Sequence, residues 1–226
     1  MVVALQANYL EVELDVAPDG CPGRLLCTRR TRLSHRGEAV YVGDRVRVEA
    51  IDPGQGRAVV AEVEPRHSFL TRPPVANVSL VAVVLAVEQP SFDPDQASRF
   101  LLTAERTGLE VILLLTKTDL FSAAALERLV TRLKGWGYDP LALSSAAGTG
   151  IDALRQRLAG AQLSVLCGPS GVGKSSLLNQ LRPDLQLRTA AVSGRLQRGR
   201  HTTRHVELFP LCLLYTSPSP RDCRLS

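Results

Sequence analysis

The chain has 226 residues, of which 45% are apolar and 22% charged, and its formal net charge is +5. This composition excludes wholesale disorder, a collagen-like repeat and a membrane bundle, and the length fits one or two domains. The longest nearly continuous apolar run, Val78 to Val87, is shorter than the ~20 residues that span a bilayer. No signal peptide is visible after Met1, so we expect a soluble, cytoplasmic protein.

The cysteines and the basic residues give further expectations. The 5 cysteines are odd in number and lack zinc-knuckle spacing, which supports neither a disulfide framework nor a metal site. Basic residues outnumber acidic ones most strongly after residue 160, and a second cluster has no acidic residue inside it. That cluster comprises Arg24, Arg29, Arg30, Arg32 and Arg36. Such clusters favour polyphosphate or nucleic acid partners, although a solvated surface has the same composition.

Residues 1–72 contain short apolar segments separated by turns, and no helix of ten residues is apparent. The alternation of apolar and charged residues in Arg45–Glu49 is typical of a half-buried strand. Glycine-containing turns follow Val42 and Ile51, so we expect strands at Val40–Val42, Arg45–Glu49 and Ala58–Val60. This pattern predicts a small all-β barrel, of which the oligonucleotide-binding (OB) fold is one type.

After a boundary near Arg72–Pro74, apolar strands alternate with amphipathic helices. Expected strands are Val78–Val87, Val111–Leu115, Leu141–Leu143 and Leu163–Cys167. Expected helices begin after Asp93 or Asp95 and end at Gly108, run from Ser122 to Gly135, and cover Asp152–Leu158. Alternation of this kind predicts an α/β domain with a parallel sheet and helices on both faces.

One segment of this α/β region has a phosphate-binding motif. Gly168–Ser175 matches G-x-x-x-x-G-K-[ST] at each fixed position, follows a buried strand and begins a helix at Ser176–Asn179. The glycines allow backbone N–H groups to point inward, and the helix N-terminus adds positive potential. Lys174 should reach the β- and γ-phosphates, while the Ser175 hydroxyl should bind Mg²⁺. The candidate residues are Gly168, Pro169, Ser170, Gly171, Val172, Gly173, Lys174, Ser175 and Ser176.

Two earlier segments are candidates for recognising the base. Thr116, Lys117, Thr118 and Asp119 follow the strand Val111–Leu115, and ligands of open α/β sheets bind at such carboxyl ends. The Asp119 carboxylate can accept two hydrogen bonds from N1–H and N2–H₂ of guanine, whereas adenine lacks these paired donors. The Lys117 stem can lie against the base plane. Ser144 and Ser145, with their neighbours Leu143 and Ala146, can offer backbone N–H groups to guanine O6.

The order of these motifs carries a resemblance to a known family. The base motif, the serine turn and the phosphate loop stand in the rotated order of circularly permuted GTPases. With a β-barrel ahead of them, the chain resembles the ribosome small-subunit-dependent GTPase A family. The supporting stretches are Val42–Val46, Arg72–Val78, Gly171–Leu177 and Gly199–Thr203. The resemblance implies a circularly permuted Ras-like P-loop domain, and hydrolysis of GTP to GDP and phosphate, stimulated by the small (30S) ribosomal subunit during its late maturation.

The resemblance also implies roles for residues after the phosphate loop. The segment Arg195–Arg204 corresponds to switch I, in which Thr202 or Thr203 would meet Mg²⁺ and the γ-phosphate. His201 matches a family histidine that helps to position the attacking water, although a solvated loop histidine is an equal interpretation. For contacts with ribosomal RNA phosphates we single out Arg29, Arg30, Arg32, Arg198 and Arg200. Lys174, His201, Thr202 and Thr203 are therefore the candidate catalytic residues, and the protein is expected to act as a monomer.

The chain departs from the family pattern at its end. The family continues with a switch II motif, D-x-P-G, and a zinc module of three cysteines and a histidine, and these are absent here. Val206–Leu211 can supply the strand that follows switch I. We therefore expect an N-terminal domain at 1–72, an incomplete GTPase domain at 73–211 and an unrelated tail at 212–226. Such a chain is expected to bind GTP poorly, because a sheet edge and a magnesium-binding aspartate are missing.

Two other functions remain open on the sequence. The phosphate loop alone is compatible with a different P-loop enzyme, such as an ATP-dependent kinase. A defective GTPase domain would leave the barrel as an RNA-binding module without catalysis. Asp119 distinguishes the first alternative, because its replacement by Asn should favour xanthine nucleotides only in a GTPase.

Overall fold

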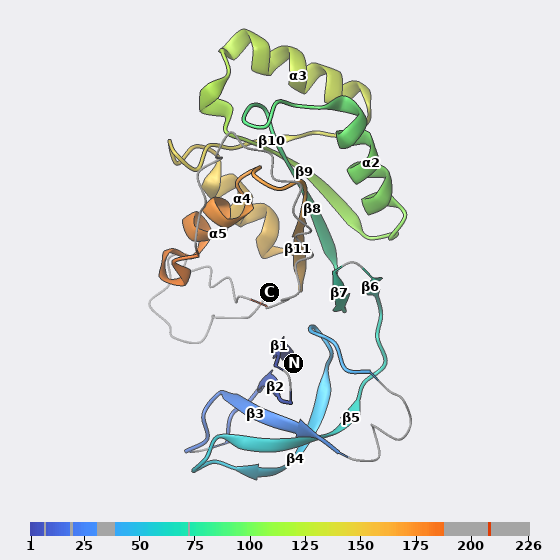
Figure 1. Cartoon of the computed structure of the whole chain (residues 1–226), viewed down its shortest axis with the longest axis vertical. Helices are drawn as coiled ribbons and strands as arrows, with labels where there is room; N and C mark the ends of the chain where they lie inside the picture. Colours follow the sequence, from blue (N-terminus) through green and yellow to red (C-terminus); the bar gives the residue numbers. More distant parts are fainter. Residues whose placement is uncertain (7, 19, 31–38, 72, 188–207, 209–226) are drawn as a thin grey trace. The chain divides into compact units, whose positions relative to one another are not determined.

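The computed structural model describes residues 1–6, 8–18, 20–30, 39–71, 73–187 and 208 (Figure 1). The described residues divide into two compact units, Met1–Val78 with Leu208, and residues 79–187. The expected boundary near residue 72 lies inside a short hairpin of the first unit, which extends to Val78. This hairpin pairs β6 (Phe69–Thr71) with β7 (Pro74–Ala76), and Val75 bridges to Val42.

The first unit contains a five-stranded sheet in the order β1-β2-β3-β5-β4. Its strands are β1 (Val2–Leu5), β2 (Leu10–Glu13), β3 (Arg24–Arg29), β4 (Val46–Asp52) and β5 (Arg57–Val63). All neighbouring strands are antiparallel except β3 and β5, which are parallel. Val2 exchanges backbone hydrogen bonds with Gly43 and Asp44, both at 2.8 Å, so that β1 meets the segment leading into β4. This strand order favours the expected OB-like barrel.

The strands of this unit follow the sequence pattern with one exception. The turn at Asp52–Gly56 joins β4 to β5, as expected, and Val60 and Leu25 are buried in the core between the strands. The expected strand at Val40–Val42 is wrong, since only Val42 forms an isolated bridge. The reason is local: the N–H of Tyr41 donates to the Asp44 carboxylate at 2.8 Å, which closes a turn in place of a strand.

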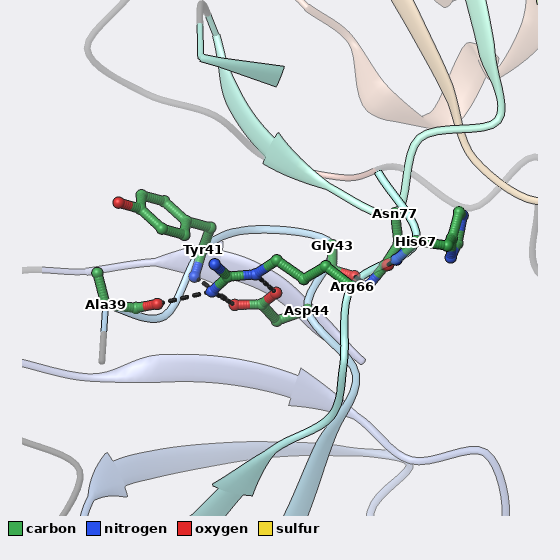
Figure 2. A network of polar contacts seen from close by, with 7 residues as sticks. All are labelled: Ala39, Tyr41, Gly43, Asp44, Arg66, His67 and Asn77. Atoms are coloured by element: carbon green, nitrogen blue, oxygen red, sulfur yellow. Dashed lines mark hydrogen bonds and ion pairs between the residues drawn. The ribbon is translucent and has the colours of Figure 1, made fainter. Parts of the chain in front are cut away.

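An ion pair between a buried carboxylate and a partly exposed arginine fixes this turn to the segment that follows β5. Asp44 is completely buried, and Arg66 donates to both of its carboxylate oxygens at 2.7 and 2.8 Å (Figure 2). Arg66 also donates to the carbonyl of Ala39 at 2.7 Å, and its guanidinium lies 4.9 Å from the centroid of the Tyr41 ring. Asn77 adds a second tie, because its amide donates to the carbonyl of Gly43 at 3.0 Å. Such bidentate pairing is the geometry in which a buried carboxylate is well satisfied.

The second unit contains a parallel sheet in the order β10-β9-β8-β11. Its strands are β8 (Leu80–Ala86), β9 (Glu110–Thr116), β10 (Leu141–Ala142) and β11 (Ser164–Cys167). All seven residues of β8 are buried, as the apolar run predicted, because both faces of the sheet are covered by helices. Within the described part of the chain, β11 pairs on one side only, with β8.

Helices cover both faces of this sheet (Figure 1). They are α2 (Pro94–Glu105), α3 (Ala123–Gly135), α4 (Ile151–Ala159) and α5 (Lys174–Leu181), with 3₁₀ turns at Thr118–Leu120 and Pro183–Leu185. Leu154, Leu158 and Leu177 of α4 and α5 share one core cluster with alternate residues of β8. The fold class predicted from the sequence, an α/β domain after an all-β region, is confirmed.

Helix boundaries test the capping predictions. Asp93, one of two expected caps, accepts from the N–H groups of Asp95 and Gln96, and Ser122 accepts from Ala125 at 3.3 Å. The predicted end of α2 at Gly108 is late, because the helix ends at Glu105 and Arg106 is its cap. One turn residue, Thr107, separates that cap from Gly108, which adopts a positive φ of 70°.

Candidate nucleotide-binding site

The phosphate loop Gly168–Gly173 joins β11 to α5, where the motif requires it. Gly168 has φ 151°, and a Cβ at this position would lie 2.1 Å from the carbonyl oxygen of Val84. No side chain fits there, so the glycine allows the loop to pass directly against β8. The Val172 side chain is buried in the core shared with α5, which anchors the far end of the loop.

Lys174, the first residue of α5, folds back over this loop. Its Nζ donates to the carbonyl oxygens of Gly168 and Pro169 at 2.8 and 2.7 Å. Burial lowers the pKa of Lys174, and the nearby Cys167 thiol only partly opposes this effect. Because the loop desolvates a cation without a carboxylate partner among the described residues, a phosphate oxygen at this point would be strongly favoured.

Thr116, at the end of β9, links the base motif to the phosphate loop. Its side chain is buried, and its hydroxyl lies 2.6 Å from the carbonyl oxygen of Val172 and 3.2 Å from that of Leu85. Thr116 was predicted from the sequence to bind the nucleotide. Its hydroxyl is engaged with the protein backbone, so it supports the site by joining β8, β9 and the phosphate loop.

Lys117 adopts a left-handed backbone conformation, with φ 59°, which turns its side chain away from the strand. Its Nζ donates to the carbonyl of Gln89 in the segment after β8. Its Cε lies 4.0 Å from where a Cβ on Gly173 would stand, so the lysine stem borders the phosphate loop. Burial lowers the pKa of Lys117, and the Asp119 carboxylate opposes this shift. The stem is thus held where a base could stack on it.

Asp119 meets the serine turn that follows β10. The hydroxyl of Ser144 donates to Asp119 Oδ1, and the same hydroxyl accepts from the N–H of Ala147 at 3.0 Å. Thr118 strengthens the junction, because its hydroxyl donates to the carbonyl of Leu143 at 3.0 Å. Ser144 therefore orients the carboxylate, whose other oxygen has no hydrogen-bond partner within the residues that the structure describes.

The turn from Ser144 to Gly150 presents adjacent backbone N–H donors that have no partner among the described residues. The N–H of Ser144 is bonded to the carbonyl of Thr149 at 3.0 Å. The N–H groups of Ser145 and Ala146 have no partner in the described ranges. The turn is tightly held at its end, where a Cβ on Gly150 would lie 2.4 Å from the carbonyl of Ala142. The predicted contact of this turn with guanine O6 would use the N–H groups of Ser145 and Ala146.

Two residues that contact the site, Gln89 and Gln180, were missed by the sequence analysis, as were the bonds of Asn179, the neighbour of Gln180. Gln89 contributes a backbone carbonyl, which no sequence pattern identifies. Asn179 of α5 makes two hydrogen bonds to the backbone of Leu187, at 2.8 and 2.9 Å. Gln180 donates from its side chain to the carbonyl of Ser145 at 2.9 Å. Asn179 and Leu187 are 8 residues apart in the sequence, whereas Gln180 and Ser145 are 35 residues apart. Only the contact of Gln180 therefore joins separate elements of the site.

The remaining predicted site residues have differing places. Ser170 and Gly171 lie at the exposed tip of the phosphate loop, and Ser175 and Ser176 lie half-buried in the first turn of α5. Arg29 and Arg30 are exposed at the end of β3, in the first unit. Outside the described residues lie Arg32, Arg198, Arg200, His201, Thr202, Thr203 and the predicted tail 212–226. Of the predicted strand Val206–Leu211, Leu208 is described, and its N–H donates to the carbonyl of Val3 in β1.

The donor set fits a purine nucleoside triphosphate with Mg²⁺. The Gly168 cradle and the buried Lys174 ammonium suit phosphate oxygens, and the Ser175 hydroxyl is a hard oxygen ligand on the same helix turn. Among the described residues, no group of three or more His, Cys, Asp or Glu side chains could hold a metal ion. No helix in the described ranges is long and apolar enough to cross a membrane.

Fold and site together define a P-loop nucleotide-binding protein in which the base motif precedes the phosphate loop. The family model described as RsgA GTPase matches residues 63–219. The chain therefore belongs to the RsgA GTPase family, which confirms the resemblance and sets aside an ATP-dependent kinase. The matched range includes residues 212–219 of the expected tail.

Named relatives agree with this assignment. A small ribosomal subunit biogenesis GTPase RsgA of Synechococcus sp. (strain CC9605) is 98% identical over 211 residues, covering 93% of this chain and 69% of that protein. One of the same name from Prochlorococcus marinus (strain MIT 9303) is 63% identical, over 94% of this chain and 70% of that protein. Both names favour a GTPase over an RNA-binding module without catalysis.

Two solved structures share the fold. The crystal structure of YjeQ from Thermotoga maritima has 34% sequence identity and a TM-score of 0.72, over 84% of this chain and 66% of that one. The crystal structure of YloQ, described as a circularly permuted GTPase, has 28% identity and a TM-score of 0.64, over 81% and 63%. The chain thus spans 66% and 63% of these two solved chains, and 69% and 70% of the two curated relatives.

Proposed function

We propose that the protein binds GTP between the phosphate loop and the two base-recognition segments, and hydrolyses it to GDP and phosphate. The observation that carries this proposal is the bond from Thr116 to Val172, which holds the guanine-selective motif against the phosphate loop. A P-loop alone would not select a base, whereas Asp119 beside Ser144 offers the paired acceptor that guanine N1–H and N2–H₂ require.

The residues of this chain contribute mainly position and charge. Lys174 neutralises charge on the β- and γ-phosphates, and backbone N–H groups of the loop bind the phosphate oxygens. Ser175 would hold Mg²⁺, which neutralises phosphate charge when bound. We extend the proposal to Thr202 or Thr203 as further magnesium and γ-phosphate contacts, and to His201 as the residue that positions water. Such a site hydrolyses slowly until a partner orders the switch segment.

The proposed partner is the small ribosomal subunit, whose biogenesis appears in the names of the relatives. We propose that the protein assists late maturation of that subunit and contacts its RNA through the first unit. Arg29 is exposed without a carboxylate partner among the described residues, whereas Arg30 pairs with Glu49 at 2.9 Å. Arg32, Arg198 and Arg200 complete the proposed phosphate contacts. A cytoplasmic location, a monomeric state and a three-part division of the chain close to the expected limits 1–72, 73–211 and 212–226 belong to the same proposal.

Hydrolysis measured with and without small ribosomal subunits tests this function. We expect slow release of phosphate from GTP by the protein alone, acceleration by the subunits, and loss of both rates in Lys174→Ala. Rapid hydrolysis without subunits, or equal affinity for ATP and GTP, would contradict the proposal. A form extended to the length of the curated relatives tests the separate expectation that the 226-residue chain is the weaker enzyme.

A further inference from the structure

We propose that Gln180 is a positioning residue that makes the site selective for 6-oxopurines by fixing one peptide plane of the serine turn. The inference rests on the proposed function, because it takes GTP as the ligand and explains how adenine nucleotides are rejected. It concerns the edge of the base that carries O6, whereas Asp119 reads the N1 and N2 positions.

The contacts form a chain from α4 through α5 to the turn. Gln180, near the end of α5, donates from Nε2 to the carbonyl oxygen of Ser145 at 2.9 Å. The backbone carbonyl of Gln180 accepts from Arg155 of α4 at 2.8 Å. Arg155 in turn contacts the carboxylate of Asp152 at 3.2 Å. The Gln180 backbone is thus held by a second helix, which limits where its amide can reach.

The hydrogen bond to Ser145 determines the direction of a neighbouring donor. In a planar trans peptide, the C=O of Ser145 and the N–H of Ala146 point in opposite directions. With the carbonyl directed to Gln180, the Ala146 N–H is directed away from it. The other side of the turn is fixed by Ser144, whose N–H and hydroxyl are both engaged. The adjacent N–H groups of Ser145 and Ala146 have no partner within the described turn, so they remain available to a ligand.

This orientation discriminates between the two purines. The O6 atom of guanine accepts hydrogen bonds, so it is complementary to fixed N–H donors. Adenine carries an amino group at the same position. This amino group and the backbone N–H groups of the turn are all donors, so both sides are left without an acceptor. If the Ser145–Ala146 peptide could rotate, its carbonyl oxygen would face the adenine amino group and accept from it. Gln180 opposes this rotation because it already binds that carbonyl.

Equilibrium binding of GTP and ATP to the wild type and to Gln180 variants tests the inference. We expect Gln180→Ala to lower the ratio of GTP to ATP affinity ~3–10-fold, the size expected for one hydrogen bond. Gln180→Glu should lower it at least as far, since a carboxylate repels the carbonyl. Gln180→Lys restores an N–H donor and should return the ratio towards the wild-type value. A general loss of folded protein would lower the apparent affinities for GTP and ATP by the same factor. The ratio of the two affinities would therefore not change.

Two controls sharpen the test. Gln156 of α4 is exposed and has no hydrogen bond among the described residues, so Gln156→Ala should leave the ratio unchanged. 6-Thioguanosine triphosphate changes only the O6 atom, to a weak acceptor, so Gln180→Ala should weaken its binding less than that of GTP. A wild-type ratio retained in Gln180→Ala overturns the inference. A wild type that does not prefer GTP contradicts the proposed function itself.

Discussion

The hydroxyl of Thr116 lies 2.6 Å from the carbonyl oxygen of Val172, a residue 56 positions later in the chain. This contact joins the end of β9 to the phosphate loop, and both groups are buried in the second unit. The base motif and the phosphate motif are therefore parts of one rigid arrangement, and a change at Thr116 should affect both parts of the nucleotide.

Thr116→Val tests this coupling, because valine preserves the shape and removes the hydroxyl. The buried carbonyl of Val172 would lose its partner, at a cost of about 1–3 kcal/mol. We expect weaker binding of both GTP and GDP, measured by titration calorimetry, and a lower melting temperature. Thr116→Ser retains the hydroxyl and serves as the control. Unchanged affinity in the valine variant would show that the contact does not support the site.

Gly168→Ala should abolish nucleotide binding. The added Cβ would lie 2.1 Å from the carbonyl oxygen of Val84, so either the loop or β8 must move. The positive φ of 151° adds further strain for any residue with a side chain. Gly160→Ala is the matched control, since its φ is −79° and a Cβ there meets nothing within 4 Å. Calorimetric GTP titration and thermal unfolding of both variants provide the comparison, and normal GTP affinity in Gly168→Ala would contradict the close approach.

Asp119→Asn should change the base preference from guanine to xanthine. The amide cannot accept both hydrogen bonds from guanine, but its N–H₂ group can donate to the O2 of xanthine. Because the Ser144 hydroxyl donates to this carboxylate, it should also donate to the amide oxygen of the asparagine and keep part of the side-chain orientation. Competition of XTP against GTP in the two proteins measures the change. An unaltered preference would exclude Asp119 from base recognition.

Arg66→Met should destabilise the first unit strongly. Asp44 is completely buried, and loss of its partner leaves an unpaired buried charge, for which about 3–5 kcal/mol is typical. Arg47→Met is a control, because Arg47 makes exposed ion pairs that contribute about 0–1 kcal/mol each. Denaturant unfolding followed by circular dichroism compares the two variants. Equal stability of both would show that the Asp44 carboxylate is satisfied without Arg66.

Local signals in the sequence were sufficient for most of the second unit. Ser122 was identifiable as a cap, and Asp93 as one of two candidates with Asp95, because a short polar side chain before an apolar helix satisfies exposed N–H groups. The seven buried residues of β8 appear as an uninterrupted apolar run. The phosphate loop combines a fixed motif with a preceding strand and a following helix, and the structure has the same arrangement.

Other features depend on contacts between distant residues. The Val40–Val42 segment has strand-like residues, but the carboxylate of Asp44 captures the N–H of Tyr41 and the segment turns. Gln180 and Gln89 stand in ordinary sequence surroundings, and their relation to the site arises only from the packing of α5 and of the segment after β8. Thr116 stays a predicted nucleotide contact, and its hydroxyl bond to Val172 is a further role that no sequence pattern indicates.

The pairing of β11 with β8 has a consequence for synthesis of the protein. β8 ends at Ala86 and β11 begins at Ser164. The ribosome therefore synthesises the intervening residues, which include both base-recognition segments, before it synthesises the strand that completes the sheet. At translation rates of about 5–20 residues per second, the apolar edge of β8 stays unpaired for roughly 4–16 s before β11 is synthesised. During that interval the nascent chain carries an open strand edge, which can pair with another chain. Faster synthesis of residues 87–164 would shorten the time for which this edge stays open.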